Sequence, residues 1–215
     1  MSRSPKLVFF ILVLLISSIL MGCAAPPEDS AEWYFQRAYE LANHGLYNAA
    51  IEVYTKAIEL KPRMAAAYVN RAAAYICKDQ SDLAIADCTK AIELDSSLVM
   101  AYLNRANAYS IIGEHSSAIA DYTKAIELDP SLTIAYFNRA NAYNVIGQYG
   151  SAIADCTKVI ELDPNLAQAY FHRGTAYKEQ GNKDAALVDF RKFITLTDDP
   201  AWIEKAGDEI QELSK

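Results

Sequence analysis

A repeat of 34 residues restricts what this chain can fold into more than any other feature of its sequence. AYLNRANAY at 101–109 returns as AYFNRANAY at 135–143, and SAIADYTKAIELDP at 117–130 returns as SAIADCTKVIELDP at 151–164. A unit this short cannot bury its own apolar face, so the copies must stack on one another. Five copies, each numbered here from position 1 to position 34, cover residues 31–64, 65–98, 99–132, 133–166 and 167–200.

The apolar residues of each copy predict two helices. Positions 4, 8 and 11 recur at helical spacing and form one stripe, and positions 20, 24 and 27 form a second. Position 4 is always tyrosine, while positions 8 and 20 are small, which lets the two helices approach closely. A left-handed helix end is expected between them. Four copies have a glycine there and the second copy has an aspartate: Gly45, Asp79, Gly113, Gly147 and Gly181.

This period, with two helical halves, resembles the tetratricopeptide repeat. The resemblance implies an all-α protein, a right-handed α-solenoid of five helix-turn-helix repeats. Residues 201–215 break the repeat, but Trp202, Ala206, Ile210 and Leu213 lie at helical spacing. We expect a C-terminal capping helix that covers the apolar end of the fifth repeat. A helix that recruits a partner is the alternative.

The first thirty residues predict an export signal and a membrane anchor. A basic start is followed by the apolar run LVFFILVLLISSIL at 7–20 and then by LMGC at 20–23. This ending resembles a bacterial lipobox, which implies a signal peptide over 1–22, lipidation of Cys23 and a tether over 23–30. By resemblance to Gram-negative lipoproteins, Ala24 implies the outer membrane, facing the periplasm. An uncleaved transmembrane anchor is the alternative.

Composition and motifs argue against several other classes of function. The net charge is −7, and residues 1–22 hold two basic and no acidic residues, so the remainder carries −9. Such a chain is not expected to bind nucleic acid, which requires clustered Lys and Arg. We find no nucleophile, phosphate-loop or metal-ligand motif. We therefore expect no enzyme activity, no cofactor and no metal.

Two further patterns are interpreted as structural. Arginine stands at position 7 of every repeat and aspartate at position 23 of four, with Val53 in the first. Antiparallel helices would bring these positions together as ion pairs. Cys88 and Cys156 share position 24 and are expected to be small buried substitutes for tyrosine. No disulfide is expected between them, because sites two repeats apart exceed the roughly 7 Å limit for bridging.

In the family that this chain resembles, peptides lie in a concave groove lined by the first helices. Here the predicted groove residues are asparagines at positions 6 and 9 and apolar residues at position 5. Amides both donate and accept hydrogen bonds, which suits an extended backbone. The alternative is that these side chains pack locally and satisfy the backbone. The predicted set is Asn70, Asn104, Asn107, Asn138, Asn141, Leu103, Phe137 and Phe171.

The resemblance also makes one negative prediction about the ligand. Family members that grip the carboxylate tails of chaperones use lysines at positions 2 and 5 and a basic residue at position 6, and this chain has no lysine or arginine at those positions. We therefore expect an adaptor in the cell envelope that binds a peptide or helix of another protein in its groove. A self-associating structural protein and a pilotin or assembly factor for an outer-membrane complex are the alternatives.

Overall fold

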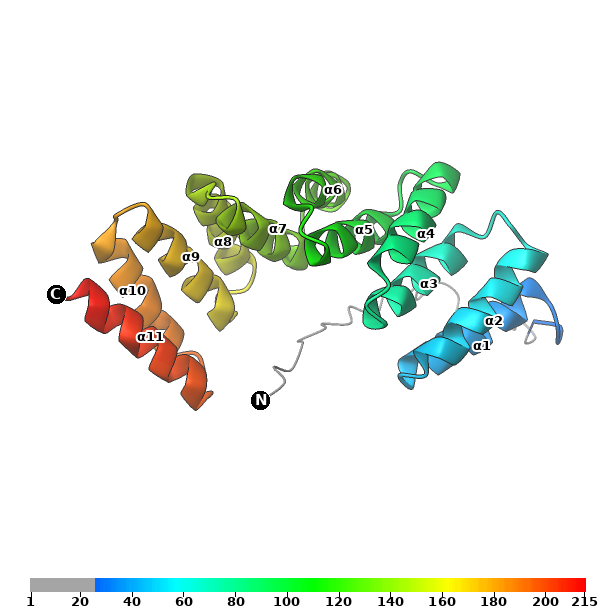
Figure 1. Cartoon of the computed structure of the whole chain (residues 1–215), viewed down its shortest axis with the longest axis horizontal. Coiled ribbons are helices and arrows are strands. Elements are labelled where there is room, and N and C mark those ends of the chain that lie inside the picture. Colours follow the sequence, from blue (N-terminus) through cyan, green and yellow to red (C-terminus); the bar gives the residue numbers. More distant parts are fainter. Residues whose placement is uncertain (1–25) are drawn as a thin grey trace.

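The computed structural model describes residues 26–215, so the predicted signal peptide and Cys23 lie outside the described residues. Residues 26–215 form eleven helices and no strand. Ten helices make five successive antiparallel pairs that stack into an arc (Figure 1), which confirms the predicted fold class. The helices are α1 (Ala31–Asn43), α2 (Tyr47–Leu60), α3 (Ala65–Cys77), α4 (Ser81–Leu94), α5 (Val99–Ile111), α6 (His115–Leu128), α7 (Thr133–Val145), α8 (Tyr149–Leu162), α9 (Ala167–Glu179), α10 (Lys183–Ile194) and α11 (Pro200–Leu213).

The turn inside each pair has the left-handed residue that the sequence predicts. Gly45, Gly113, Gly147 and Gly181 have φ between +75° and +85°, and Asp79 has φ +58°. Such angles are costly for most side chains and free for glycine. Each turn is therefore short, and the second helix of a pair runs back along the first.

The core lies between the helices of each pair and between neighbouring pairs. The alanines at position 20 are fully buried in every repeat, as are all five residues at position 24. Cys88 and Cys156 are 0% exposed, which confirms their role as small core residues. Burial raises the pKa of the Cys156 thiol to about 12. The residues at position 24 are Tyr54, Cys88, Tyr122, Cys156 and Phe190.

The predicted ion pairs form in repeats two to five, and they are largely buried. Arg105 Nε lies 2.7 Å and its Nη2 2.9 Å from the two carboxylate oxygens of Asp121, and these side chains are 18% and 10% exposed. The Asp121 hydrogen bond raises the pKa of Arg105. In the first repeat, where Val53 replaces aspartate, Arg37 instead pairs with Glu40 on the surface. The other three pairs are Arg71–Asp87, Arg139–Asp155 and Arg173–Asp189.

Each of these arginines also contacts the preceding repeat, which the sequence analysis did not predict. Arg105 Nη1 donates to the hydroxyl of Thr89 at 3.0 Å, and Arg139 Nη1 does the same to Thr123 at 2.9 Å. The Arg139 guanidinium carbon also lies 5.7 and 5.8 Å from the ring centres of Tyr136 and Tyr143. The arginine therefore joins the two helices of its own repeat to the repeat before it.

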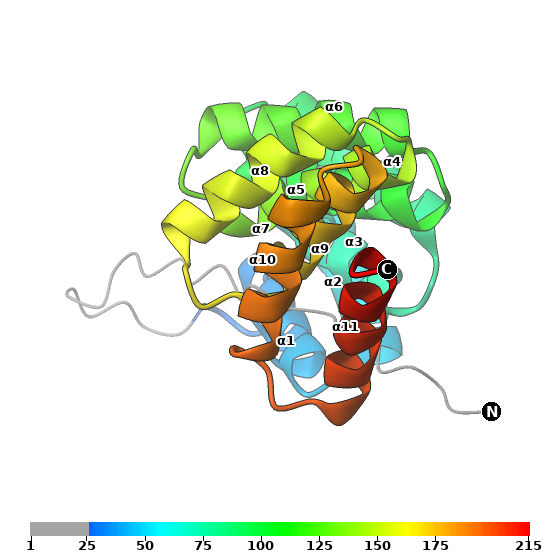
Figure 2. The ribbon, with the colours of Figure 1, turned by 90° about the vertical axis from the view of Figure 1, so that its left-hand side faces the viewer.

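Helix α11 covers the C-terminal end of the array beside α10, as the view along the array shows (Figure 2). Asp199 caps its first turn by accepting a hydrogen bond from the Ala201 amide at 3.0 Å. Ala206 is fully buried and Leu213 is 9% exposed. Lys178 of α9 holds the outer side of α11 through Glu209 at 2.7 Å and Glu212 at 2.8 Å. The helix thus packs as the predicted cap.

Candidate functional site

A groove of about 1110 Å³ runs along the first helices of repeats one to four and reaches the start of α9. Most of its lining side chains come from α1, α3, α5 and α7, with additions from the loops between repeats. We call this set of lining residues the groove. Its apolar surface is provided mainly by side chains at positions 1, 2, 5 and 13, among them Val69, Val99, Met100, Leu103, Ile111, Ile134 and Phe137.

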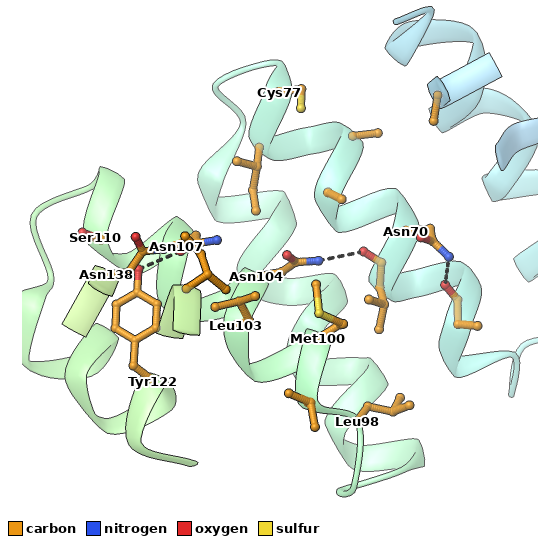
Figure 3. A pocket seen from close by; sticks show the side chains of 18 of the residues that line it. Asn70, Cys77, Leu98, Met100, Leu103, Asn104, Asn107, Ser110, Tyr122 and Asn138 are labelled. Carbon is orange, nitrogen blue, oxygen red and sulfur yellow. Dashed lines mark hydrogen bonds between the residues drawn. The ribbon is translucent and has the colours of Figure 1, made fainter. Parts of the chain in front are cut away.

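Two of the predicted asparagines line the groove but already bond to the backbone (Figure 3). Asn70 Nδ2 donates to the Ala66 carbonyl of its own helix at 3.0 Å. Asn104 is 8% exposed, and its Nδ2 donates to the Val69 carbonyl of the preceding first helix at 3.4 Å. The Asn104 amide therefore ties α5 to α3 as well as facing the groove.

A second polar cluster lies further along the groove. Asn107 Oδ1 accepts hydrogen bonds from Tyr122 Oη at 2.7 Å and from Asn138 Nδ2 at 3.0 Å (Figure 3). Desolvation raises the pKa of Tyr122, so its hydroxyl stays protonated and acts as the donor. The fifth asparagine, Asn141, also lines the groove, and its buried Oδ1 has no hydrogen-bond partner among the described residues. The structure thus brings all five asparagines to one surface, with three amide groups engaged in donating bonds.

The three predicted residues at position 5 do not share one environment. Leu103 is 3% exposed and Phe137 is partly buried, and both line the groove. Phe171 is absent from the lining, because α11 lies over it. The Phe171 ring centre lies 5.4 Å from Phe190 and 5.1 Å from Trp202. The cap converts Phe171 into a core residue, so we leave it out of the candidate site.

The groove is almost free of charge. Among residues 26–215, its lining contains no lysine, arginine or histidine, and Asp163 is the one acidic side chain in it. Next to the C-terminal end of the groove, His172 contacts Phe137 at 5.2 Å between ring centres. Burial, with a smaller contribution from the Lys205 ammonium, lowers the pKa of His172 to about 4. The site therefore has no cation with which to bind a carboxylate at neutral pH.

Sequence reasoning missed the groove residues that lie outside the first helices. Tyr122 comes from α6, while Leu98, Asp163 and Leu166 come from the loops between repeats. Their repeat positions, 24 and 31–34, carry core or loop residues in every copy. The curvature of the array brings a few of the residues at these positions to the groove. The sequence of a single repeat does not predict which of them will line it.

Within residues 26–215, none of the helices has the length and apolar character needed to cross a membrane. The same part of the chain contains no cluster of three or more His, Cys, Asp or Glu side chains suited to a metal ion.

Family comparison now identifies the repeat. Models described as tetratricopeptide repeat match residues 31–64, 65–98, 99–132, 133–166 and 156–188. The chain belongs to the tetratricopeptide repeat family. No curated protein matches this tetratricopeptide repeat chain in sequence.

Solved structures of the same family have the same fold. The MamA protein is 25% identical with a TM-score of 0.72, over 77% of this chain and 90% of MamA. YrrB, described as having an unusual peptide-binding site, is 23% identical with a TM-score of 0.73, over 84% of this chain and 93% of YrrB. The first such domain of Spaghetti (RPAP3), bound to the HSP90 peptide SRMEEVD, is 26% identical with a TM-score of 0.54. It aligns over 56% of this chain and 95% of its own.

Proposed function

We propose that this protein is a non-enzymatic scaffold that holds an apolar segment of another protein in its groove. The observation that carries the proposal is the continuous, nearly uncharged groove of about 1110 Å³ across four successive first helices. A concave, mostly apolar surface with a few polar groups is the usual form of a ligand-binding site in proteins. The asparagine amides along it supply polar atoms that can meet a ligand backbone without selecting its side chains.

The proposed ligand differs from the acidic peptide bound by the RPAP3 domain. That peptide, SRMEEVD, carries three carboxylate side chains. Removing a carboxylate from water is unfavourable unless the binding site provides a cation or several N–H donors. Within the part of the chain that the structure describes, the groove is lined by no basic side chain and by one acidic side chain. We therefore expect SRMEEVD to bind at least tenfold more weakly than an uncharged apolar peptide, which fluorescence anisotropy would measure.

A groove-filling variant tests the proposal without removing any packing contact. Ala73 is partly exposed on the groove floor, so Ala73→Trp would occupy the space of a ligand. Ala120→Trp, at an exposed site on α6 outside the groove, is the matched control. A partner captured from envelope extracts by wild type and by Ala120→Trp, but not by Ala73→Trp, would support the proposal. Equal capture by all three would place binding on another surface.

We further propose that the scaffold is a lipoprotein of the cell envelope, anchored through Cys23 and facing the periplasm at the outer membrane. The sequence ending LMGC at 20–23 supports this. The tether of 23–30 can span at most about 25 Å, which would keep the array close to the membrane. Metabolic labelling with palmitate should mark wild type and not Cys23→Ser. A mature protein that retains residues 1–22, shown by intact mass, would favour the uncleaved anchor instead.

Self-association is the other arrangement to test. Light scattering with size-exclusion chromatography on residues 24–215 would distinguish a monomeric scaffold from a self-associating structural protein. A stable dimer whose formation is abolished by Ala73→Trp would mean that a second copy occupies the groove.

A further inference from the structure

The C-terminal end of the groove contains a carboxylate that the fold does not use fully. Asp163 is the C-cap residue directly after α8, is exposed, and lines the groove. One of its oxygens, Oδ1, accepts a hydrogen bond from the Asn165 amide at 3.0 Å. No basic side chain among residues 26–215 forms an ion pair with it.

The equivalent residues in two other repeats behave differently. Asp95 Oδ1 accepts bonds from both the amide and the hydroxyl of Ser97, at 2.9 and 2.6 Å. Asp129 has the same two bonds to Ser131, at 3.0 and 2.7 Å, and neither aspartate lines the groove. Because asparagine replaces that serine after Asp163, the side-chain bond is lost. The fourth repeat therefore presents to the groove a carboxylate with more free acceptor capacity than its counterparts.

A second acceptor in the same repeat also lacks a donor. In the third repeat, the Asn107 oxygen accepts from Tyr122 and from Asn138. The corresponding oxygen in the fourth repeat belongs to Asn141, and the residues equivalent to the two donors are Cys156 and His172. Neither donates to it, and the buried Asn141 Oδ1 has no partner among the described residues. A buried acceptor without a donor is unfavourable, so the fourth repeat carries a second unsatisfied acceptor beside the groove.

The charge of the whole protein favours the same kind of ligand. The sequence carries −7 in total, and residues 23–215 carry −9. The groove lining adds no positive charge to offset this. The field of the protein therefore attracts cationic segments to the groove and repels acidic ones.

From these observations we infer that the groove selects an apolar segment with lysine or arginine at one end, and that this basic end lies against Asp163. The inference rests on the proposed function, since it describes the partner of the same groove. A basic side chain at that end pairs with the exposed carboxylate of Asp163. The apolar residues of the segment then cover Ile134, Phe137 and Leu103.

Three fluorescein-labelled peptides test this inference by anisotropy on residues 24–215. They share an uncharged core of Leu, Phe and Ser and end in Lys-Lys, Gln-Gln or Glu-Glu. The Lys-Lys peptide should bind most tightly and the Glu-Glu peptide most weakly, about tenfold apart at low salt, with the difference shrinking as salt screens the charges. Asp163→Asn should reduce the advantage of Lys-Lys over Gln-Gln by about threefold. Asp129→Asn, which removes the same charge outside the groove, should leave that advantage nearly unchanged.

The outcomes separate the inference from the proposed function. Suppose that the Gln-Gln peptide binds wild type as tightly as the Lys-Lys peptide does, and that both bind the Ala73→Trp variant more weakly. The groove then binds apolar segments without a preference for a basic end, and the inference is wrong. If Asp163→Asn and Asp129→Asn lower Lys-Lys binding equally, the preference comes from net charge and Asp163 is not its site, which also refutes the inference. If Ala73→Trp weakens binding of none of the peptides, the proposed function itself fails.

Discussion

The buried ion pair of the third repeat allows a quantitative test of how the array is held together. Asp121→Asn keeps the shape of the side chain but leaves the Arg105 guanidinium, 18% exposed, without its counter-charge. Removing one partner of a fully buried pair costs about 3–5 kcal/mol, while exposed pairs contribute roughly 0–1 kcal/mol. With exposures of 18% and 10%, we expect Asp121→Asn to lower the free energy of unfolding by about 2–4 kcal/mol.

The same chain provides the controls. Arg37 and Glu40 are 56% and 61% exposed, so Arg37→Gln should cost under about 0.5 kcal/mol. Thr89→Ala removes only the bond between repeats, at 3.0 Å, and should cost about 1 kcal/mol. A double-mutant cycle between Thr89 and Arg105 would isolate that coupling.

Urea unfolding of residues 24–215, followed by circular dichroism at 222 nm, measures all of these variants. In a linear array, loss of a central link can also separate the transition into two steps, which would appear as a reduced urea dependence. If Asp121→Asn costs no more than Arg37→Gln and leaves that dependence unchanged, the Arg–Asp pairs do not hold the repeats together.

Three further predictions concern the core and the cap. The pKa of His172 is about 4 in the folded protein and about 6.5 when unfolded, so stability should be full above pH 6.5 and fall as pH drops towards 4. The loss due to this group should reach about 2 kcal/mol at pH 5. It is measured as the fall in unfolding free energy from pH 7 to pH 5 that occurs in wild type and not in His172→Asn, a variant with the asparagine that three other repeats have at this position. In residues 24–215, which lack Cys23, Ellman's reagent should react with the half-buried thiol of Cys77 in the native state and with the buried thiols of Cys88 and Cys156 only after unfolding. Rapid native reaction of all three thiols would contradict the packing. Deleting α11 should expose Phe171 and cause association in light scattering, and a truncated chain as soluble and cooperative as the whole would show that α11 is no cap.

The period of 34 residues was sufficient to predict the fold because each helix buries the same positions in every copy. The turn glycines, the Arg–Asp pairs and the buried cysteines all follow from a single repeat considered alone. The bond from Arg105 to Thr89 does not, because it depends on how one repeat sits on the next. Phe171 shows the same limit, since its environment is set by α11, which has no counterpart in the other repeats.

The differences among the repeats point to the site more directly than their shared residues do. Positions 7, 8 and 20, which join the helices, are almost the same in all five copies, and none of the arginines at position 7 lines the groove. Positions 6 and 9 of the first four repeats all line it, and they vary from Gln36 and Tyr39 in the first to Asn138 and Asn141 in the fourth. Because the shared residues already account for folding, variation at the groove is not required for it. A scaffold that only filled space could repeat one residue at these positions, whereas a groove that binds a segment in one direction needs its two ends to differ.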